Sequence, residues 1–195
     1  MKVTLVLLIV AVIVAVGVVR ERPGLDPQDV DEASDGTIIF RGGDETDKRD
    51  HGRPVALIAA ALGVPDQVFR DAFSNVRPAR GAGPTEARAR ANKKVLMDAL
   101  GQYGITNRRL DEVSDYYRYN RSRGEHWPHT PATAVAVIRG DTVTDVRITN
   151  PGSGYSSPPR VIVAGHPQVK AVAQLAFGTD FRTNGSIKSL TIVSQ

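Results

Sequence analysis

The period of the hydrophobic pattern changes near Pro128, and this change constrains the fold more than any other feature of the chain. Residues 53–120 carry apolar side chains at helical spacing. From Ala132 onward apolar and polar residues alternate, and β-branched types become frequent. Helices and strands segregated along a chain in this way are typical of an α+β protein. The sequence therefore predicts a small helical region followed by an antiparallel β region of about five to six strands.

The helical region is predicted to contain about four helices. Residues that commonly open or cap helices mark the expected starts: Pro54, Pro65, Thr85, and Thr106 or Asn107. Gly63 is expected to end the first helix, and Tyr103 to continue the apolar face of the third. One short strand is predicted ahead of these helices, at residues 37–40.

The β region repeats part of its own pattern. The apolar positions Ile187, Leu190 and Ile192 match Val143, Val146 and Ile148. Gly140-Asp141 and Asn184-Gly185 are predicted to be the corresponding hairpin turns. We interpret the region as one and a half copies of a three-strand unit, which pair to bury a face that neither copy would bury alone.

A turn between two predicted strands, residues 150–161, reads NPGSGYSSPPRV. It resembles the G-x-G-Y-x-S-x-P-x-V repeats of bacterial surface proteins and phage structural proteins. This resemblance covers residues 132–195 and implies a spacer or display scaffold without a defined activity. The helical region, with Gly63-Val64-Pro65 and the YYRY stretch at 116–119, is similar to that of exported bacterial proteins that join these same two parts.

The N-terminal stretch 3–19 is uncharged, and Thr4 is its only polar side chain. As a helix it would span about 25 Å, slightly less than a hydrocarbon core of about 30 Å. A signal peptide cleaved near Ala15-Val16-Gly17 and an uncleaved anchor both remain open. Either one predicts that residues 3–19 meet the membrane and that the folded part works outside the cytoplasm. The flanking charges constrain orientation only weakly.

These features divide the chain into four parts. They are a signal peptide or membrane anchor (1–19), a flexible acidic tether (20–36), a helical domain (37–127) and a β-repeat domain (128–195). The net charge is +4, and residues 51–195 hold 19 Lys and Arg against 11 Asp and Glu. A basic body favours an anionic envelope component, or another protein, as partner. The absence of cysteine excludes disulfides, thiolate metal sites and cysteine nucleophiles.

Aromatic and basic side chains gather near the end of the helical region. Aromatic faces interleaved with guanidinium groups suit stacking against a ligand, although the same spacing also suits core packing. The predicted binding surface consists of Tyr116, Arg118, Tyr119, Arg121 and Trp127, together with Tyr155 from the Gly-Ser-Gly-Tyr turn.

Signatures of catalysis, cofactors and metals are missing from the sequence. There is no nucleophile elbow around Ser153, no phosphate-binding loop and no H-E-x-x-H. His126 and His129 lack a third ligand at a useful spacing. Asp44, Asp47 and Asp50 are interpreted as a solvated loop rather than a calcium site. We therefore predict no catalytic, cofactor-binding or metal-binding residues.

The leading hypothesis is a non-enzymatic, exported or membrane-tethered envelope protein with a structural or binding role. One alternative is a membrane-anchored DNA-binding regulator that uses residues 54–74, which are similar to a helix-turn-helix of bacterial repressors. Asp66 would lead the second helix there and would oppose phosphate, so nucleic acid is not the favoured partner. The other alternative is an enzyme of unfamiliar type, with Asp115, Tyr119, Glu125 and His126 at the junction of the two domains.

Overall fold

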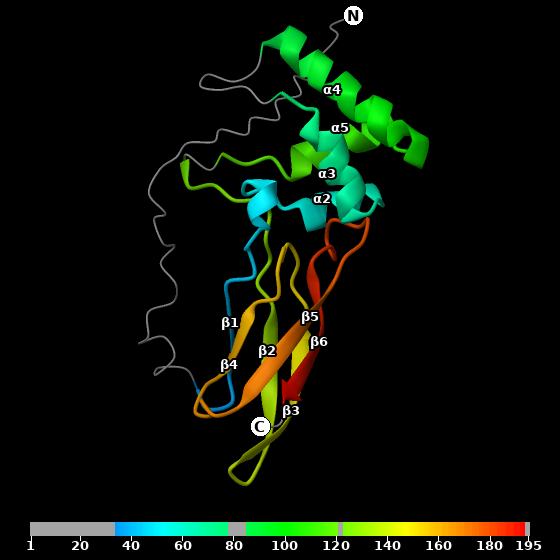
Figure 1. The fold of residues 1–195 in the computed structure, drawn as a ribbon. Coiled ribbons are helices and arrows are strands. Elements are labelled where there is room, and N and C mark those ends of the chain that lie inside the picture. Colours follow the sequence, from blue (N-terminus) through cyan, green and yellow to red (C-terminus); the bar gives the residue numbers. More distant parts are fainter. Residues whose placement is uncertain (1–33, 78–84, 121–122, 194–195) are drawn as a thin grey trace, which may run out of the picture. The chain divides into compact units, whose positions relative to one another are not determined.

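The computed structural model describes residues 34–77, 85–120 and 123–193, and Figure 1 labels its elements. Over these residues the protein is α+β, with four α-helices and antiparallel sheets of four and two strands, as the sequence predicts. The predicted N-terminal hydrophobic helix and most of the tether lie outside the described residues. Within the described ranges, no helix is long and apolar enough to cross a membrane.

The described residues form two compact units, and the chain passes through one of them twice. The helical unit contains residues 58–128, and the β unit contains residues 34–57 together with 129–193. Strand β1 (Ile38–Arg41) comes from the predicted helical domain but belongs to the β unit, because it pairs with β4 (Arg160–Val163). The two units are therefore not consecutive along the chain.

The helices begin and end close to their predicted positions: α2 (Val55–Leu62), α3 (Asp66–Ser74), α4 (Glu86–Leu100) and α5 (Asn107–Tyr116). Threonines cap two of them, as predicted. The Thr85 hydroxyl accepts the Arg88 N–H at 3.3 Å, and the Thr106 hydroxyl accepts the Arg109 N–H at 3.2 Å. Each bond satisfies an amide that the first turn of a helix leaves without a partner.

The helical unit is held by apolar burial and by polar contacts between helices. Leu62, Phe73, Leu100 and Leu110 come from four different helices and are all buried. Arg109 on α5 donates from Nε and Nη2 to the carbonyl of Ala61 on α2, at 3.2 and 2.7 Å. Carbonyls in the last turn of a helix lack partners within it, so this guanidinium satisfies the end of α2.

Tyr103 does not continue the apolar face of α4, and that prediction is wrong. α4 ends at Leu100, and a 3-10 turn, η2 (Gly101–Tyr103), follows it. The tighter winding of a 3-10 turn rotates the next side chains away from the buried face of the α-helix. The Tyr103 side chain is consequently 49% exposed.

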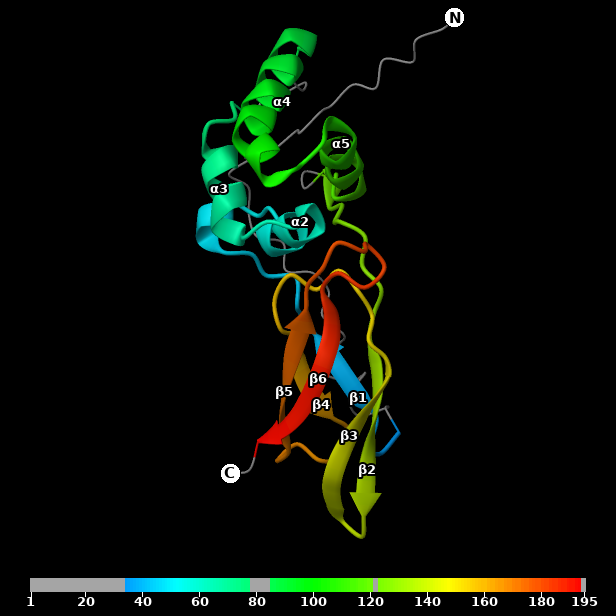
Figure 2. The ribbon, with the colours of Figure 1, turned by 90° about the vertical axis from the view of Figure 1, so that its right-hand side faces the viewer.

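The six strands surround a single core. β1, β4, β5 (Lys170–Ala176) and β6 (Ser186–Val193) form one sheet in that order, and β2 (Thr133–Arg139) pairs with β3 (Thr142–Asn150) in the other. The sheets meet at both edges: Thr37 bridges Val135 next to β1 and β2, and the Ile187 N–H donates to the Pro151 carbonyl at 2.9 Å. Figure 2 shows β3 alongside β6. The strands thus follow one another as β1-β4-β5-β6-β3-β2.

The two hairpins of this unit share one register, which confirms the predicted match between them. Corresponding residues oppose one another in each: Ala134/Ile148 with Ala171/Ile192, Ala136/Val146 with Ala173/Leu190, and Ile138/Val143 with Leu175/Ile187. An irregularity interrupts the register just before Ile138 and, in the second hairpin, just before Leu175. The hairpins therefore match in a local distortion as well as in sequence.

The turns of the two hairpins differ. Gly140-Asp141 connects β2 to β3, as predicted. Asn184-Gly185 is not a two-residue turn, because β5 ends at Ala176 and β6 begins only at Ser186. Asn184 has no exposed surface and holds this longer loop together. Its Nδ2 donates to the Leu57 carbonyl at 2.7 Å, and its Oδ1 accepts the Gly178 N–H at 3.1 Å.

We predict that Asn184→Ala lowers the free energy of unfolding by about 2–4 kcal/mol, because it leaves a buried carbonyl and a part-buried N–H without partners. Urea denaturation measures the change. Lys188→Ala, at a nearby exposed position of β6, is the matched control and is expected to alter stability by less than about 0.5 kcal/mol. Equal stability of the two variants would contradict a clamping role for Asn184.

Candidate binding surface

The predicted binding residues fall in two separate places. Tyr116, Arg118, Tyr119 and Trp127 lie in the helical unit, at and after the end of α5, whereas Tyr155 lies in the β unit. Arg121 lies outside the described residues. The first group is the candidate surface, and Tyr155 has a different role.

The chain after α5 folds back on itself within a few residues. The Asn120 carbonyl accepts the N–H groups of Arg123 and Glu125, at 3.0 and 3.1 Å. In return, the Glu125 carboxylate accepts the Asn120 N–H at 2.8 Å. These three bonds close the backbone between Asn120 and Glu125. As a result, the residues before and after this closure, Tyr119 and His126, become neighbours.

Three aromatic rings meet at this closure. The Tyr119 and His126 rings are stacked, with centroids 6.2 Å apart and planes 14° from parallel. Trp127 meets both rings edge-on, at 5.5 Å from Tyr119 and 5.4 Å from His126. Trp127 is only 4% exposed, whereas Tyr119 is half-buried and His126 is exposed. Trp127 therefore supports the stacked pair from inside and does not itself offer a surface.

Two further candidate side chains come from the end of α5 and the residues just after it. Tyr116 is half-buried and meets the buried Tyr117 ring edge-on at 4.9 Å. The Arg118 guanidinium is exposed and forms an ion pair with Asp115 on the last turn of α5. We use the name aromatic surface for Tyr116, Arg118, Tyr119 and His126. It combines flat apolar rings with a guanidinium, a pairing suited to a ligand that has both a ring face and negative charge.

His126 is the member of this surface that the predicted binding set lacks. Its stacking on Tyr119 depends on the closure between Asn120 and Glu125. No spacing rule relates residues 119 and 126, because neither belongs to a helix or a strand there. The only signal in the sequence is the run of aromatic residues on either side of a short polar stretch.

Tyr155 is buried in the β unit, with 2% of its surface exposed, and it cannot form part of an open surface. Its phenol oxygen accepts the Ala132 N–H at 2.9 Å, and the His129 ring meets its ring edge-on at 4.6 Å. Burial raises the pKa of the Tyr155 phenol, and the Ala132 N–H opposes that effect in part. Gly43 lies against the ring so closely that a methyl group there would come within 2.5 Å of Tyr155 Cδ1.

The other residues of the Gly-Ser-Gly-Tyr turn also make structural contacts. Ser153 exchanges two backbone hydrogen bonds with Thr130, both at 3.0 Å. The Ser156 hydroxyl donates to the Glu45 carbonyl at 2.8 Å, and the Ser157 hydroxyl bonds the Glu45 carboxylate. The turn thus joins residues 43–45 to residues 130–132 within the β unit. The Ser156 and Ser157 hydroxyls therefore contribute to the fold.

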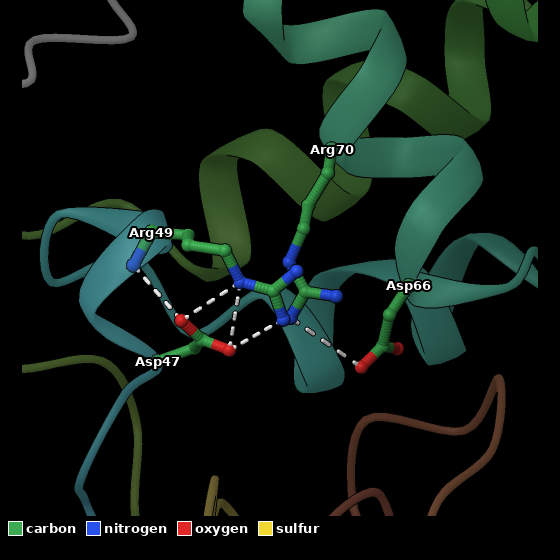
Figure 3. Close-up of polar contacts among 4 residues, drawn as sticks. All are labelled: Asp47, Arg49, Asp66 and Arg70. Carbon is green, nitrogen blue, oxygen red and sulfur yellow. Dashed lines mark hydrogen bonds and ion pairs between the residues drawn. The ribbon is translucent and has the colours of Figure 1, made fainter.

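The helix pair α2 and α3, predicted as the alternative DNA-binding element, carries its leading polar side chains in local pairs. Arg70 lies 3.8 Å from Asp66 on α3 (Figure 3). The Gln67 amide donates to Asp71 at 2.7 Å. Two carboxylates therefore flank the residues that would face a duplex, and they oppose phosphate. The geometry adds no support to DNA recognition by α3.

The acidic stretch that follows β1 caps a short turn. Asp47 accepts the backbone N–H of Arg49 at 2.9 Å at the start of the 3-10 helix η1 (Lys48–Asp50), and it also pairs with the Arg49 guanidinium (Figure 3). Asp50 is buried. Across the described ranges, no group of three or more His, Asp or Glu side chains is placed to hold a metal ion.

The acids proposed for a junction enzyme also have local partners. Asp115 pairs with Arg118, and Glu125 accepts the Asn120 N–H. A general acid or base must lie within hydrogen-bond reach of the group whose proton it moves. Tyr119 and His126 are brought together by ring stacking. No family model, curated protein or solved structure matches the chain.

We predict that Tyr155→Phe lowers the free energy of unfolding by about 1–3 kcal/mol, because the buried Ala132 N–H loses its acceptor. Urea denaturation at neutral pH checks this value. Tyr103→Phe removes a phenol from an exposed ring and serves as the control. A loss as large in the control would show that the effect is not due to burial.

We also predict that the stability effect of Tyr155→Phe depends on pH. Because the folded pKa of Tyr155 is raised above its usual value, its contribution to stability is complete below about pH 10. It falls as the pH rises further, since the unfolded chain then loses this proton first. The stability difference between wild type and Tyr155→Phe should therefore be complete at pH 8 and smaller at about pH 10.5. A difference that grows over this range would contradict burial of a neutral phenol.

Proposed function

We propose that this protein is a non-enzymatic envelope protein, exported or tethered through residues 3–19, that binds an anionic envelope component through the aromatic surface. The observation that carries the proposal is the stacked Tyr119–His126 pair, which rests on buried Trp127. The exposed Arg118 directly precedes Tyr119 in the chain. Supported aromatic faces offer a preformed contact area at a low cost in side-chain entropy.

Two features support an envelope role over a catalytic one. The Gly-Ser-Gly-Tyr turn, which resembles repeats of surface proteins, uses its serines and tyrosine for contacts within the β unit. The folded part also carries an excess of basic residues after residue 50, which attracts acidic polymers in general. We propose an acidic glycan as the ligand class, because its sugar rings suit aromatic faces and its carboxylates suit a guanidinium.

We predict that a reporter active only after export, fused behind residue 195, is active in cells. The uncharged stretch 3–19 is expected to deliver the fusion across the membrane. Replacing Leu8 and Val12 with arginine should abolish that activity, because charges within the apolar stretch prevent insertion. Activity confined to a cytoplasmic reporter at the same position would overturn the export proposal.

We predict that Tyr119→Ala weakens binding to polygalacturonate, a uronic acid polymer, by about fivefold, since one aromatic contact is worth about 1 kcal/mol. Affinity electrophoresis of residues 34–195 measures the change. Tyr103→Ala removes a more exposed tyrosine elsewhere in the helical unit and should leave binding unaltered.

A matched pair of arginines separates specific contact from general charge. Arg118→Ala should weaken binding, whereas Arg108→Ala should not, although each arginine pairs with a carboxylate on α5 and Arg108 is the more exposed. Equal losses for the two variants would show that the polymer reads net charge alone, and the aromatic surface would then be the wrong site.

A further inference from the structure

The strand register shows that β1 and β4 occupy equivalent positions, just as the first and second hairpins do. Val161 on β4 lies opposite Ala171 on β5. The bridge between Thr37 and Val135 places Ile38 opposite Ala134 in the same antiparallel sense. Ala134 and Ala171 are counterparts in the two hairpins. Ile38 therefore occupies the same position relative to β2 that Val161 occupies relative to β5.

The pairing of β1 with β4 has the symmetry that this relation requires. Ile38 opposes Val163, and Phe40 opposes Val161. Exchanging Ile38 with Val161 and Phe40 with Val163 turns each of these pairs into the other. β1 and β4 thus pair around a two-fold axis that passes between them, and the contact between β3 and β6 lies across the same axis.

The core follows the same symmetry. Its apolar side chains fall into corresponding pairs: Ile38/Val161, Phe40/Val163, Ala132/Val169, Ala134/Ala171, Ala136/Ala173, Ile138/Leu175, Val143/Ile187, Val146/Leu190 and Ile148/Ile192. Within that core, Tyr155 is the one member that has no counterpart. The agreement extends to side chains that face the core from every strand.

We infer that the β unit is two complete copies of a three-strand element, β1-β2-β3 and β4-β5-β6, and that the helical unit is an insertion between the first two strands of the first copy. This replaces the predicted one and a half copies. The connection from β4 to β5 spans only residues 164–169, whereas the connection from β1 to β2 contains residues 58–128. The strand that completes the first copy, β1, is separated from β2 in the sequence by the helical unit, so the sequence pattern does not reveal that it belongs to the repeat.

The inference has a conformational consequence for the full chain. All six strands that enclose the β core lie outside the helical unit. Asn184 donates to the Leu57 carbonyl, at the point where the chain leaves the β unit. The helical unit can therefore unfold locally while the strands of the β unit stay paired. Cooperative units of this kind open with separate free energies. A binding module could then rearrange on its ligand without releasing its scaffold.

Hydrogen exchange of the full chain, in mild detergent with a low concentration of urea, tests this. Leu110→Ala empties a buried position in the helical unit and should accelerate exchange of α4 and α5 amides by more than about tenfold. The amides of β1 should keep their wild-type rates. Val163→Ala empties a buried position on β4 and should accelerate β1 together with the other strands, with α4 and α5 unchanged.

The outcome that overturns the inference is exchange of β1 in step with the helical unit in Leu110→Ala. Leu100→Ala, in α4, repeats the test from a second position should the first variant fail to fold. Exchange of β1 separately from β2 and β3 in Val163→Ala would also contradict a complete first copy. Neither result depends on whether the aromatic surface binds a glycan, so the two proposals stand or fall separately.

Discussion

The hydrogen bond from the Ala132 N–H to the buried Tyr155 phenol links segments of the β unit that lie 23 residues apart in the chain. Tyr155 contacts three segments that are far apart in the sequence. Its ring lies against Gly43, its phenol oxygen accepts the Ala132 N–H, and its own N–H donates to the Gly185 carbonyl at 3.0 Å. Each of these segments adjoins a strand from a different hairpin or sheet edge. A buried phenol with a satisfied acceptor is favourable, whereas a buried amide without one is costly.

Local chemistry explains why much of the fold can be predicted from the sequence. Thr85 and Thr106 cap helices because their hydroxyls bond amides only three residues away. The β2 and β5 strands follow from alternation, which needs no knowledge of the partner strand. The position of β1 and the role of Asn184 could not be predicted in this way. Both depend on contacts with residues more than a hundred positions distant, such as Asn184 with Leu57.

The candidate surface was only partly predictable, for a related reason. The sequence identifies Tyr116, Arg118 and Tyr119 by type, because aromatic and guanidinium groups suit binding wherever they are exposed. It does not distinguish these from Trp127 and Tyr155, which have the same chemistry but are buried. Exposure was decided by the closure between Asn120 and Glu125 and by the packing of Gly43 on Tyr155. Neither contact leaves a spacing pattern.

A motif that resembles a surface repeat is best judged by what its side chains do. In this protein the serines and the tyrosine of the Gly-Ser-Gly-Tyr turn are occupied by bonds to Glu45, Ala132 and neighbouring backbone, so they have little left to offer a ligand. The aromatic surface differs, because its rings are supported from within yet remain accessible. If the helical unit is an insertion, the two sets of residues also belong to separate parts of the fold: the turn holds the β unit together, whereas the aromatic surface lies within the helical unit.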